Sequence, residues 1–313
     1  MTQAISTTIP HGRTARRLDW VHLPPMVRRA VEKRLGSPVV GAQSQDAGFT
    51  PGFASVLTCA DGSRHFVKAA SVKAQRLFAD AYREEARKLR TIPPGVPAPR
   101  LQWVHEGDDW IALGIEYVEG RAPQRPWTAS DLAAASDMLI RTAEALTPAP
   151  GLGLATFAEE FADLPAYWDQ IARLDPDLPG LAEAAALAAR FAEVTAGETL
   201  VHTDVRDDNL IIGEETVWLC DWNWPCRGAG WIDSLMLLIG PRGDGLDVEA
   251  HIAAHPLLST VPAEAVDILL ALVLGHFLWS AAQPVPHTSP WIRDAQQWQG
   301  DVVHDWLAER RGW

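Results

Sequence analysis

The sequence predicts an α+β protein with two lobes, a small strand-rich lobe followed by a larger helical lobe. Most strand-like segments lie before residue 120, where short apolar runs are separated by turn residues. After residue 120, alanine-rich segments with helical periodicity dominate. We place the boundary at Val118-Glu119-Gly120, so the lobes are residues 1–119 and 120–313.

The small lobe is expected to contain two helices and four strands. Its first helix, Asp19 to Leu35, is followed by Gly36-Ser37-Pro38, which ends it. The dipeptide Asp61-Gly62 between two apolar runs is a hairpin signal. The predicted strands are Phe53–Cys59, Arg64–Ala69, Leu101–His105 and Trp110–Val118, and the second helix is Val72–Arg90.

The larger lobe is expected to consist mainly of helices around one hairpin. An uncharged stretch from Ile268 to Ile292 is interrupted by His276, Gln283, Pro284 and Pro286, so we interpret it as part of a buried core helix within residues 264–282 and not as a membrane span. Ser130 is a plausible N-cap for the first of the helices. These helices are Trp127–Leu146, Leu181–Thr195, Ile232–Ile239, Ala263–Ala282 and Trp291–Arg310.

Composition narrows the possible partners and compartment. Residues 1–119 hold 16 Lys/Arg and 12 Asp/Glu, whereas residues 120–313 hold 11 and 28, so a basic half precedes an acidic half. This fits an enzyme whose first half binds polyphosphate and whose second half binds a cationic substrate, although acidic helix surfaces also serve solubility. No basic stripe favours nucleic acid.

The N-terminus and the cysteines indicate a cytoplasmic protein. Met1–Arg17 is polar and basic without an apolar segment, so we expect neither a signal peptide nor order there. Three cysteines without CxxC spacing suggest reduced thiols. Cys220 lies in an apolar run, which predicts a core position.

One segment carries most of the chemistry. Asp204 is followed by Asn209 five residues later, and Asp221 ends the second strand of a predicted hairpin. Kinase-type phosphoryl transfer needs such a set, in which one carboxylate orients and deprotonates a hydroxyl while an amide and a second carboxylate hold Mg²⁺. His202 is expected to be structural and to hydrogen-bond the loop backbone.

A lysine and a glutamate in the small lobe are expected to pair. Lys68 shares one strand face with Phe66, and Glu85 lies within the apolar stripe of the following helix. An inward carboxylate needs a partner, because burying an unpaired charge is costly. The pair would present the ammonium to nucleotide phosphates. The neighbouring Glu84 is expected to face solvent, where it could pair with Lys88 four residues later on the helix.

Weaker signals surround this set. Gly48 and Gly52 could bring backbone N–H groups near phosphate, but an ordinary loop explains them equally well, and no P-loop motif occurs. Backbone groups near Glu116 and Val118 could hydrogen-bond adenine. Arg206 is expected to pair with a neighbouring aspartate or to contact phosphate. Many of the 14 tryptophans crowd the motif and the C-terminus, where core packing is the default.

Together these residues resemble the aminoglycoside phosphotransferase family. The likeness covers His202-x-Asp204-x-x-x-x-Asn209, Asp221-Trp222 and Asp233, and extends to Val67-Lys68 and Glu85. It implies the two-lobed protein-kinase-like fold, ATP (with GTP not excluded) and Mg²⁺, and a small-molecule hydroxyl as acceptor. By the same likeness Asp204 is the base, Asn209 and Asp221 bind the metal, Lys68 and Glu85 orient the nucleotide, and Asp233 anchors the loop.

The sequence departs from the pattern of this family at two places, and the resemblance leaves alternative acceptors and functions open. Thr203 stands where the family commonly has glycine, and Arg206-Asp207-Asp208 replaces its usual residues before Asn209. The acceptor is first expected to be an aminoglycoside-like or other antibiotic, and the alternative is a metabolite of the choline, fructosamine or homoserine type. A catalytically silent ligand-binding module is a further alternative. The gap between Asp221 and Asp233 is too short for the peptide platform of a protein kinase.

Overall fold

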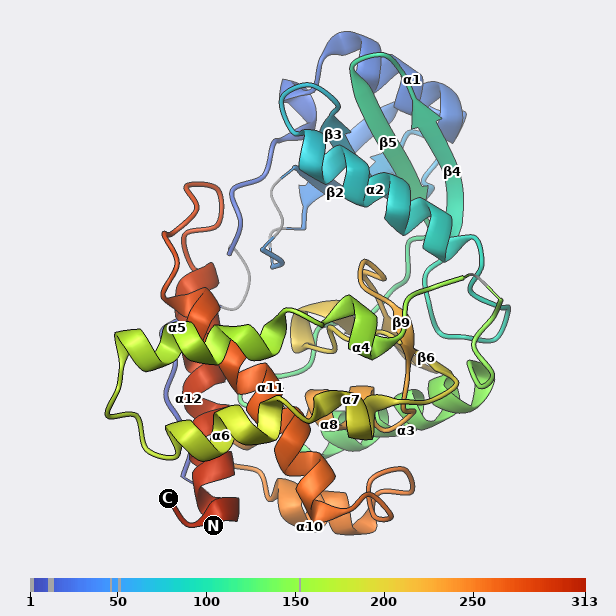
Figure 1. The fold of residues 1–313 in the computed structure, drawn as a ribbon. Coiled ribbons are helices and arrows are strands. Elements are labelled where there is room, and N and C mark those ends of the chain that lie inside the picture. Colours follow the sequence, from blue (N-terminus) through green and yellow to red (C-terminus); the bar gives the residue numbers. More distant parts are fainter. Residues whose placement is uncertain (1–2, 11–13, 46, 50–51, 152) are drawn as a thin grey trace.

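A computed structural model describes residues 3–10, 14–45, 47–49, 52–151 and 153–313, and it shows the predicted two lobes (Figure 1). A five-stranded antiparallel sheet with two helices forms the small lobe at the top of the view, and a larger helical lobe lies below it. The predicted α+β class is therefore confirmed. The position of the boundary near residue 119 remains our proposal.

The small-lobe sheet has the strand order β1-β2-β3-β5-β4. Each strand pairs antiparallel to its neighbours, and Lys68 on the central strand lies opposite Ala54 on one side and Leu113 on the other. Lys68 is thereby placed in the middle of the sheet. The strands are β1 (Val39–Ser44), β2 (Phe53–Cys59), β3 (Arg64–Ser71), β4 (Leu101–Glu106) and β5 (Trp110–Ile115).

Helices cover both faces of this sheet. The short 3₁₀ helix η1 (Trp20–His22) and α1 (Pro25–Leu35) pack on one face, where Val27 and Val31 join Phe53 and Leu57 in a small core. Helix α2 (Arg76–Leu89) packs on the other face, and its buried residues belong to the main core that continues into the larger lobe. Glu85 lies on the buried side of α2, as its place in the apolar stripe predicted.

The larger lobe is built around α11 (Ala263–Ala281). Twelve of its residues are buried, and it packs against α5, α6, α7 and α12. By length and composition it is the one described helix that could cross a membrane, but 67% of its apolar window is buried inside the protein. The other helices are α3 (Ala129–Ala145), α4 (Phe157–Glu160), η2 (Leu164–Ala166), α5 (Tyr167–Leu174), α6 (Leu181–Ala188), α7 (Phe191–Thr195), α8 (Ile232–Leu237), α9 (Ile239–Gly243), α10 (Val248–Ala254) and α12 (Ile292–Arg311).

The larger lobe also contains two small strand pairs. Strand β6 (Thr199–Val201) pairs with β9 (Cys226–Gly228), and β7 (Leu210–Ile212) forms a hairpin with β8 (Val217–Leu219). Between β6 and β7 lies the short helix η3 (Asp207–Asn209). The interlobe linker is tied to this hairpin, because Arg121 and Ile212 exchange backbone hydrogen bonds of 3.0 and 2.7 Å.

Several predicted bounds were wrong. The first helix begins at Pro25 and not at Asp19, because a residue before proline avoids the helical conformation and proline is favoured at the first helical position. The N-cap of α3 is Thr128, whose Oγ1 accepts the Asp131 N–H, and not Ser130. The elements that the sequence did not predict include β1, β9, α4, α5, α9 and α10, and the predicted helix Leu181–Thr195 is two helices.

The N-terminal segment is anchored where we expected fraying. The Ile5 N–H donates to Gly243 O at 2.8 Å, and Trp298 Nε1 donates to Ile5 O at 2.9 Å. The segment runs beside α12 toward the small lobe, where Arg16 N donates to Thr288 O (Figure 1). Part of the expectation, for Met1, Thr2 and His11–Arg13, lies outside the described residues.

Candidate active site

The loop between β6 and β7 is held from below by a buried aspartate. Asp233, at the start of α8, accepts the backbone N–H groups of His202 and Thr203 at 2.7 and 2.8 Å. Thr203 has φ +70°, in the left-handed region that favours glycine, and its Oγ1 donates to Trp224 O at 2.9 Å. Asp233 thus has the loop-anchoring geometry that the resemblance implied.

His202 is fully buried and hydrogen-bonds the backbone on both sides. Its Nδ1 accepts the Asp204 N–H at 3.2 Å, so the ring proton is on Nε2, which donates to Cys220 O at 2.8 Å. This is the structural role expected of it. The second bond joins the loop to the end of β8, where Asp221 follows.

Asp204 projects from this loop beside Asn209 and Arg206. Asn209 Nδ2 donates to the Asp204 backbone oxygen at 2.8 Å and to its carboxylate at 3.0 Å. The guanidinium of Arg206 lies 3.1 Å from Asp204 and forms two bonds, of 2.9 and 3.1 Å, with Asp208. The Asp204 side chain is 30% exposed, so a bound molecule can reach it.

Asn209 and Asp221 are brought together by the β7–β8 hairpin. The Cys220 N–H donates to Asn209 O at 2.8 Å, which aligns the residue before Asp221 with Asn209. Because Asn209 uses its amide N–H groups on Asp204, its Oδ1 is the atom left for a metal. Asp221 has φ +66° and accepts the side-chain amide of Asn223 at 2.8 Å.

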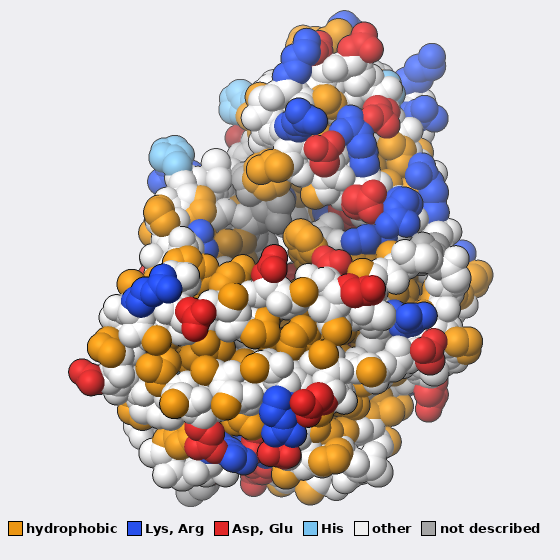
Figure 2. All heavy atoms as spheres, viewed as in Figure 1, with side chains coloured by type: hydrophobic (Ala, Val, Ile, Leu, Met, Phe, Trp, Pro, Cys, Tyr) orange, Lys and Arg blue, Asp and Glu red, His pale blue; other side chains and the backbone are white. Residues whose placement is uncertain are grey.

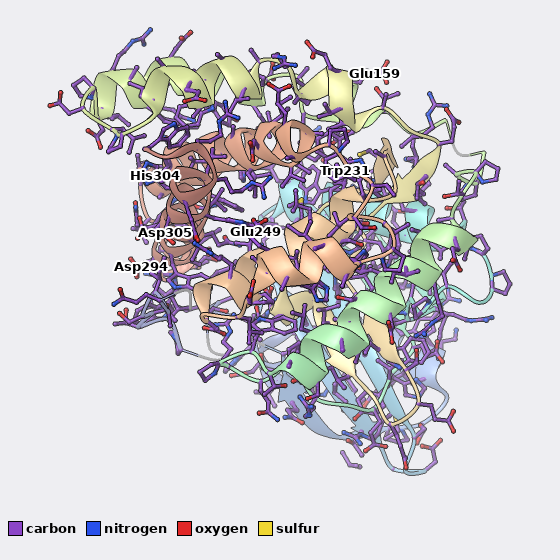
Figure 3. All side chains as sticks on the ribbon, turned by 90° about the horizontal axis from the view of Figure 1, so that it is seen from below. Glu159, Trp231, Glu249, Asp294, His304 and Asp305 are labelled. Atoms are coloured by element: carbon purple, nitrogen blue, oxygen red, sulfur yellow. The ribbon has the colours of Figure 1, made fainter. Side chains whose placement is uncertain are left out.

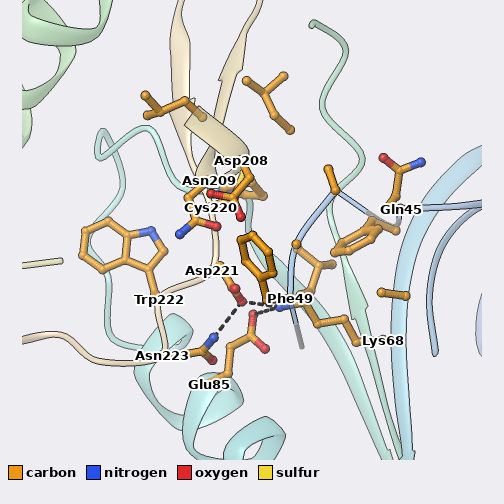
Figure 4. Close-up of a pocket in the computed structure, with 18 of the residues that line it drawn as sticks. Gln45, Phe49, Lys68, Glu85, Asp208, Asn209, Cys220, Asp221, Trp222 and Asn223 are labelled. Atoms are coloured by element: carbon orange, nitrogen blue, oxygen red, sulfur yellow. Dashed lines mark hydrogen bonds and ion pairs between the residues drawn. The ribbon is translucent and has the colours of Figure 1, made fainter. Parts of the chain in front are cut away.

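Lys68 links the small lobe to the metal-binding candidates. Its Nζ lies 2.7 Å from Glu85 Oε1 and 2.6 Å from Asp221 Oδ1, so the predicted ion pair with Glu85 is present and a second carboxylate joins it (Figure 4). Among the described residues Glu85 Oε2 has no hydrogen-bond partner, although it is buried. The three groups come from β3, α2 and the end of β8, so the site forms only when the lobes are folded together.

Burial and neighbouring charges shift the pKa values of these groups in opposite directions. Burial would raise the pKa of Asp221, but the Lys68 ammonium lowers it to about 2. Burial would lower the pKa of Lys68, but Asp221 and Glu85 raise it. For Glu85, burial prevails over the charge of Lys68, and its pKa is raised. At neutral pH, Lys68 and Asp221 are therefore charged.

A cavity of about 950 Å³ adjoins this cluster and extends to the interlobe linker. Its lining combines Lys68, Asn209 and Asp221 at one end with apolar side chains such as Ile115 and Leu210. Glu116 and Val118, which we predicted to lie near the adenine, also line it. However, the Glu116 N–H donates to Arg100 O at 2.8 Å, so only its carbonyl remains for adenine.

Described residues of the loop before β2, among them Gly48 and Phe49, also line the cavity. Phe49 is close to Lys68 and Asp221 in Figure 4, and the Arg206 guanidinium is 5.6 Å from the centre of its ring. Ser289 Oγ donates to Phe49 O, and Thr14 Oγ1 donates to Gly48 O at 3.0 Å. Asp46, Thr50 and Pro51, which belong to the predicted phosphate-approaching loop, lie outside the described residues.

Sequence reasoning missed or misplaced several neighbours. Asn223, which orients Asp221, follows it by two residues in a segment without periodicity. Cys220 is half-buried and lines the cavity, whereas we expected a core position, because β8 ends one residue earlier. Burial raises its pKa to about 12, so it remains a thiol. Glu84 pairs with Arg87 at 2.9 Å, and Lys88 instead donates to Asn223 O at 2.5 Å.

The side-chain atoms available for a metal and for phosphate indicate which chemistry this arrangement can perform. Among the described residues no cluster of three His, Cys, Asp or Glu side chains could hold a metal alone. Mg²⁺, however, is usually bound by one or two protein oxygens together with phosphate oxygens. Asn209 Oδ1 and Asp221 fit that pattern, with a lysine for phosphate beside them.

Comparison with known proteins shows the fold. No known family profile and no curated protein matches the chain. Among solved structures, a choline/ethanolamine kinase family protein from Mesorhizobium loti is similar with a TM-score of 0.57 and 15% identity over 91% of this chain and 95% of that one. A macrolide 2'-phosphotransferase type I follows with a TM-score of 0.54 and 17% identity over 87% and 95%.

A third similar structure is a choline kinase from Cryptosporidium parvum Iowa II, with a TM-score of 0.53 and 8% identity over 92% of this chain and 96% of that one. At these identities the likeness establishes the fold alone. The chain has the two-lobed, kinase-like fold of small-molecule phosphotransferases, as the sequence resemblance implied.

Proposed function

We propose that this chain is an ATP- and Mg²⁺-dependent phosphotransferase that acts on a hydroxyl group of a small molecule. The observation that carries the proposal is that Lys68, Asn209 and Asp221 line one end of a nucleotide-sized cavity, while Asp204 is hydrogen-bonded to Asn209 beside it. The similar structures support it, because those named above are by name kinases or phosphotransferases of small molecules.

Each residue has a distinct role in this proposal. Bound Mg-ATP would supply the terminal phosphoryl group and leave as ADP. Asn209 and Asp221 would hold the metal through oxygen, and Lys68, oriented by Glu85, would bind phosphate oxygens. The carbonyl of Glu116 and the N–H of Val118 would bind the base of the nucleotide. The nucleotide could be GTP instead of ATP.

Asp204 would act on the acceptor. It would orient the attacking hydroxyl and accept its proton as the hydroxyl oxygen bonds to phosphorus. Arg206, already 3.1 Å from Asp204, could move to the transferred phosphoryl group. The free cysteines agree with a reducing compartment, and we place the reaction in the cytoplasm.

The substitution Asp204→Asn tests the proposal. Because it removes the proton acceptor but keeps the shape, we expect transfer to fall about 1000-fold while Mg-ATP affinity changes less than about twofold. Transfer is measured with γ-labelled ATP and a panel of hydroxyl compounds, and nucleotide affinity by calorimetry. The control is Asp175→Asn, an exposed aspartate after α5.

Two results would contradict the proposal. Turnover that survives in Asp204→Asn would remove the base from the mechanism. A wild-type protein that binds no Mg-nucleotide would favour the silent ligand-binding module.

A further inference from the structure

A second cavity, of about 910 Å³, adjoins the first and shares Asp207, Asp221 and Asn223 with it. Asp204, Arg206 and Trp224 belong to its lining, together with residues from α8, α9, α11 and α12. Figure 2 shows the hollow between the small lobe and the larger one. A cavity of this size accommodates a drug-sized molecule whose hydroxyl could reach Asp204.

The aspartates that line this cavity already have partners within the chain. Arg206 pairs with Asp204 and Asp208, Arg125 with Asp207, and Lys68 with Asp221. The remaining one, Asp244, accepts the Trp127 N–H at 2.7 Å. The described lining contains no glutamate. A polycationic ligand would therefore have to displace internal cations to find carboxylates, which costs free energy.

Most acidic residues of the larger lobe lie outside this cavity. Glu159, Asp294 and Asp305 are exposed and lie at the outside of the lobe when it is viewed from below (Figure 3). Glu264 and Glu309 are likewise exposed and pair with Arg190 and Arg242, respectively. Most of the charge that suggested a cationic substrate therefore faces solvent, where it favours solubility.

Apolar side chains make up most of the cavity wall. Phe161, Met236, Phe277 and Trp298 come from four separate parts of the larger lobe, and Ile5 of the N-terminal segment adds to them. Trp224 stands at the edge shared by both cavities and is 55% exposed, a large apolar surface without a cover. Such a wall gains free energy by burying apolar surface of a ligand.

The polar groups that α11 and α12 contribute to this wall are neutral. His276 on α11 lines the cavity, and its Nδ1 is buried without a hydrogen-bond partner among the described residues. Burial lowers the pKa of this imidazole, so it is uncharged at neutral pH. Gln296 and Gln299 of α12 lie on the same wall. These groups suit hydroxyl, ether or carbonyl oxygens.

From this lining we infer that the acceptor is a large, mainly apolar molecule that carries a few hydroxyl groups and at most one positive charge, and that polycations are poor substrates. This inference rests on the proposed function of the adjoining site. His276 would be a specificity-determining residue that hydrogen-bonds the acceptor away from the reacting hydroxyl.

The test compares two groups of probes on the full-length protein with Mg-ATP. Erythromycin and digitoxin represent apolar hydroxyl compounds, and kanamycin and neomycin represent polycations. We expect the apolar group to bind and be phosphorylated with a kcat/KM at least about tenfold higher, since apolar burial drives its binding. Its KM should change less than about twofold between low and high salt, because screening affects charged ligands most.

Two side-chain truncations test whether the second cavity causes the preference for apolar acceptors. Trp224→Ala should raise the KM for the apolar compound about tenfold, because it removes exposed apolar surface at the mouth. Leu174→Ala is the matched control, since Leu174 is 60% exposed on α5 outside both cavities, and it should leave the KM unchanged. Equilibrium binding, followed by calorimetry without nucleotide, gives a readout that does not depend on turnover.

The outcomes separate the two proposals. Efficient phosphorylation of the polycations, or binding of neither apolar probe, overturns the acceptor inference and leaves the phosphotransferase proposal to the Asp204→Asn test. Tight apolar binding without any transfer or nucleotide binding overturns the phosphotransferase proposal, while the cavity assignment stands. An unchanged KM in Trp224→Ala also counts against the inference.

Discussion

Lys68 is the residue on which both lobes converge. Its side chain is 10% exposed and contacts one carboxylate from its own lobe and one from the other, so a single cation balances two buried or half-buried acids. Removing one partner of such a cluster leaves charge uncompensated, which is costlier than the pair itself is stabilising. The cluster therefore couples the stability of the molecule to the same atoms that would bind nucleotide.

The first residue-scale prediction concerns Asp221→Asn. The pKa of Asp221 is about 2 in the folded protein and 3.8 in a reference state, so its contribution is present above the higher value and is lost as pH falls through the lower one. We expect the variant to lose about 2 kcal/mol of unfolding free energy at neutral pH. Urea titrations across pH measure this loss.

The pH dependence distinguishes this explanation from a packing defect. The difference between wild type and variant should be constant from about pH 8 to about pH 5 and shrink below about pH 4. Asp175→Asn, at an exposed site, should show no such difference. A deficit that stayed the same at low pH would mean that the lost stability is not electrostatic.

Some residue roles could be read from the sequence and others could not. The Lys68–Glu85 contact was predictable, because strand alternation and helical periodicity place both side chains inward. Asn223, Arg125 and His276 were not, since each reaches the site from a segment without a motif. The pairing of Arg125 with Asp207 joins residues 82 positions apart, and no local pattern reports such a contact.

At the scale of elements, the loop between β6 and β7 is the most constrained part of the site. Thr203 adopts a positive φ that costs about 1 kcal/mol for a residue with a Cβ. The two N–H bonds to Asp233 and the Oγ1 bond to Trp224 O offset that cost. The threonine that departs from the family pattern thus has a physical explanation.

A pair of substitutions at Thr203 tests this. Thr203→Val keeps the branched shape and the backbone strain but loses the hydrogen bond, so it should destabilise the protein by about 1 kcal/mol. Thr203→Gly loses the same bond but relieves the strain, so its loss should be smaller. Thermal unfolding ranks the two, and a valine variant as stable as wild type would show that the Oγ1 bond contributes nothing.

The elements that sequence reasoning missed share a cause. Strands β1 and β9 contain glycine and polar residues instead of clear alternation, and α4 and α10 have four and seven residues, too few for periodicity to register. The N-terminal segment has no regular structure, so only tertiary contacts such as Trp298 with Ile5 order it. Local signals located the longer elements, and packing decided the rest.

For the whole molecule, the fold class and lobe order followed from the sequence, because strand and helix signals separate along the chain. The shape of the acceptor cavity did not, since its wall is assembled from the N-terminal segment, α4, α8, α11 and α12. Net charge pointed toward a cationic acceptor, whereas the described lining aspartates are paired. A charge count over a lobe therefore says little about the charge of one cavity.

The proposed phosphoryl transfer requires one divalent ion and a terminal phosphate between the lobes. The most direct measurement is a crystal structure of the wild-type protein with Mg²⁺ and a non-hydrolysable ATP analogue. We predict metal density within coordination distance of Asn209 Oδ1 and an Asp221 carboxylate oxygen, phosphate oxygens near Lys68, and the terminal phosphate directed toward Asp204. Nucleotide bound elsewhere, or a terminal phosphate turned away from Asp204, would contradict the mechanism proposed for this protein.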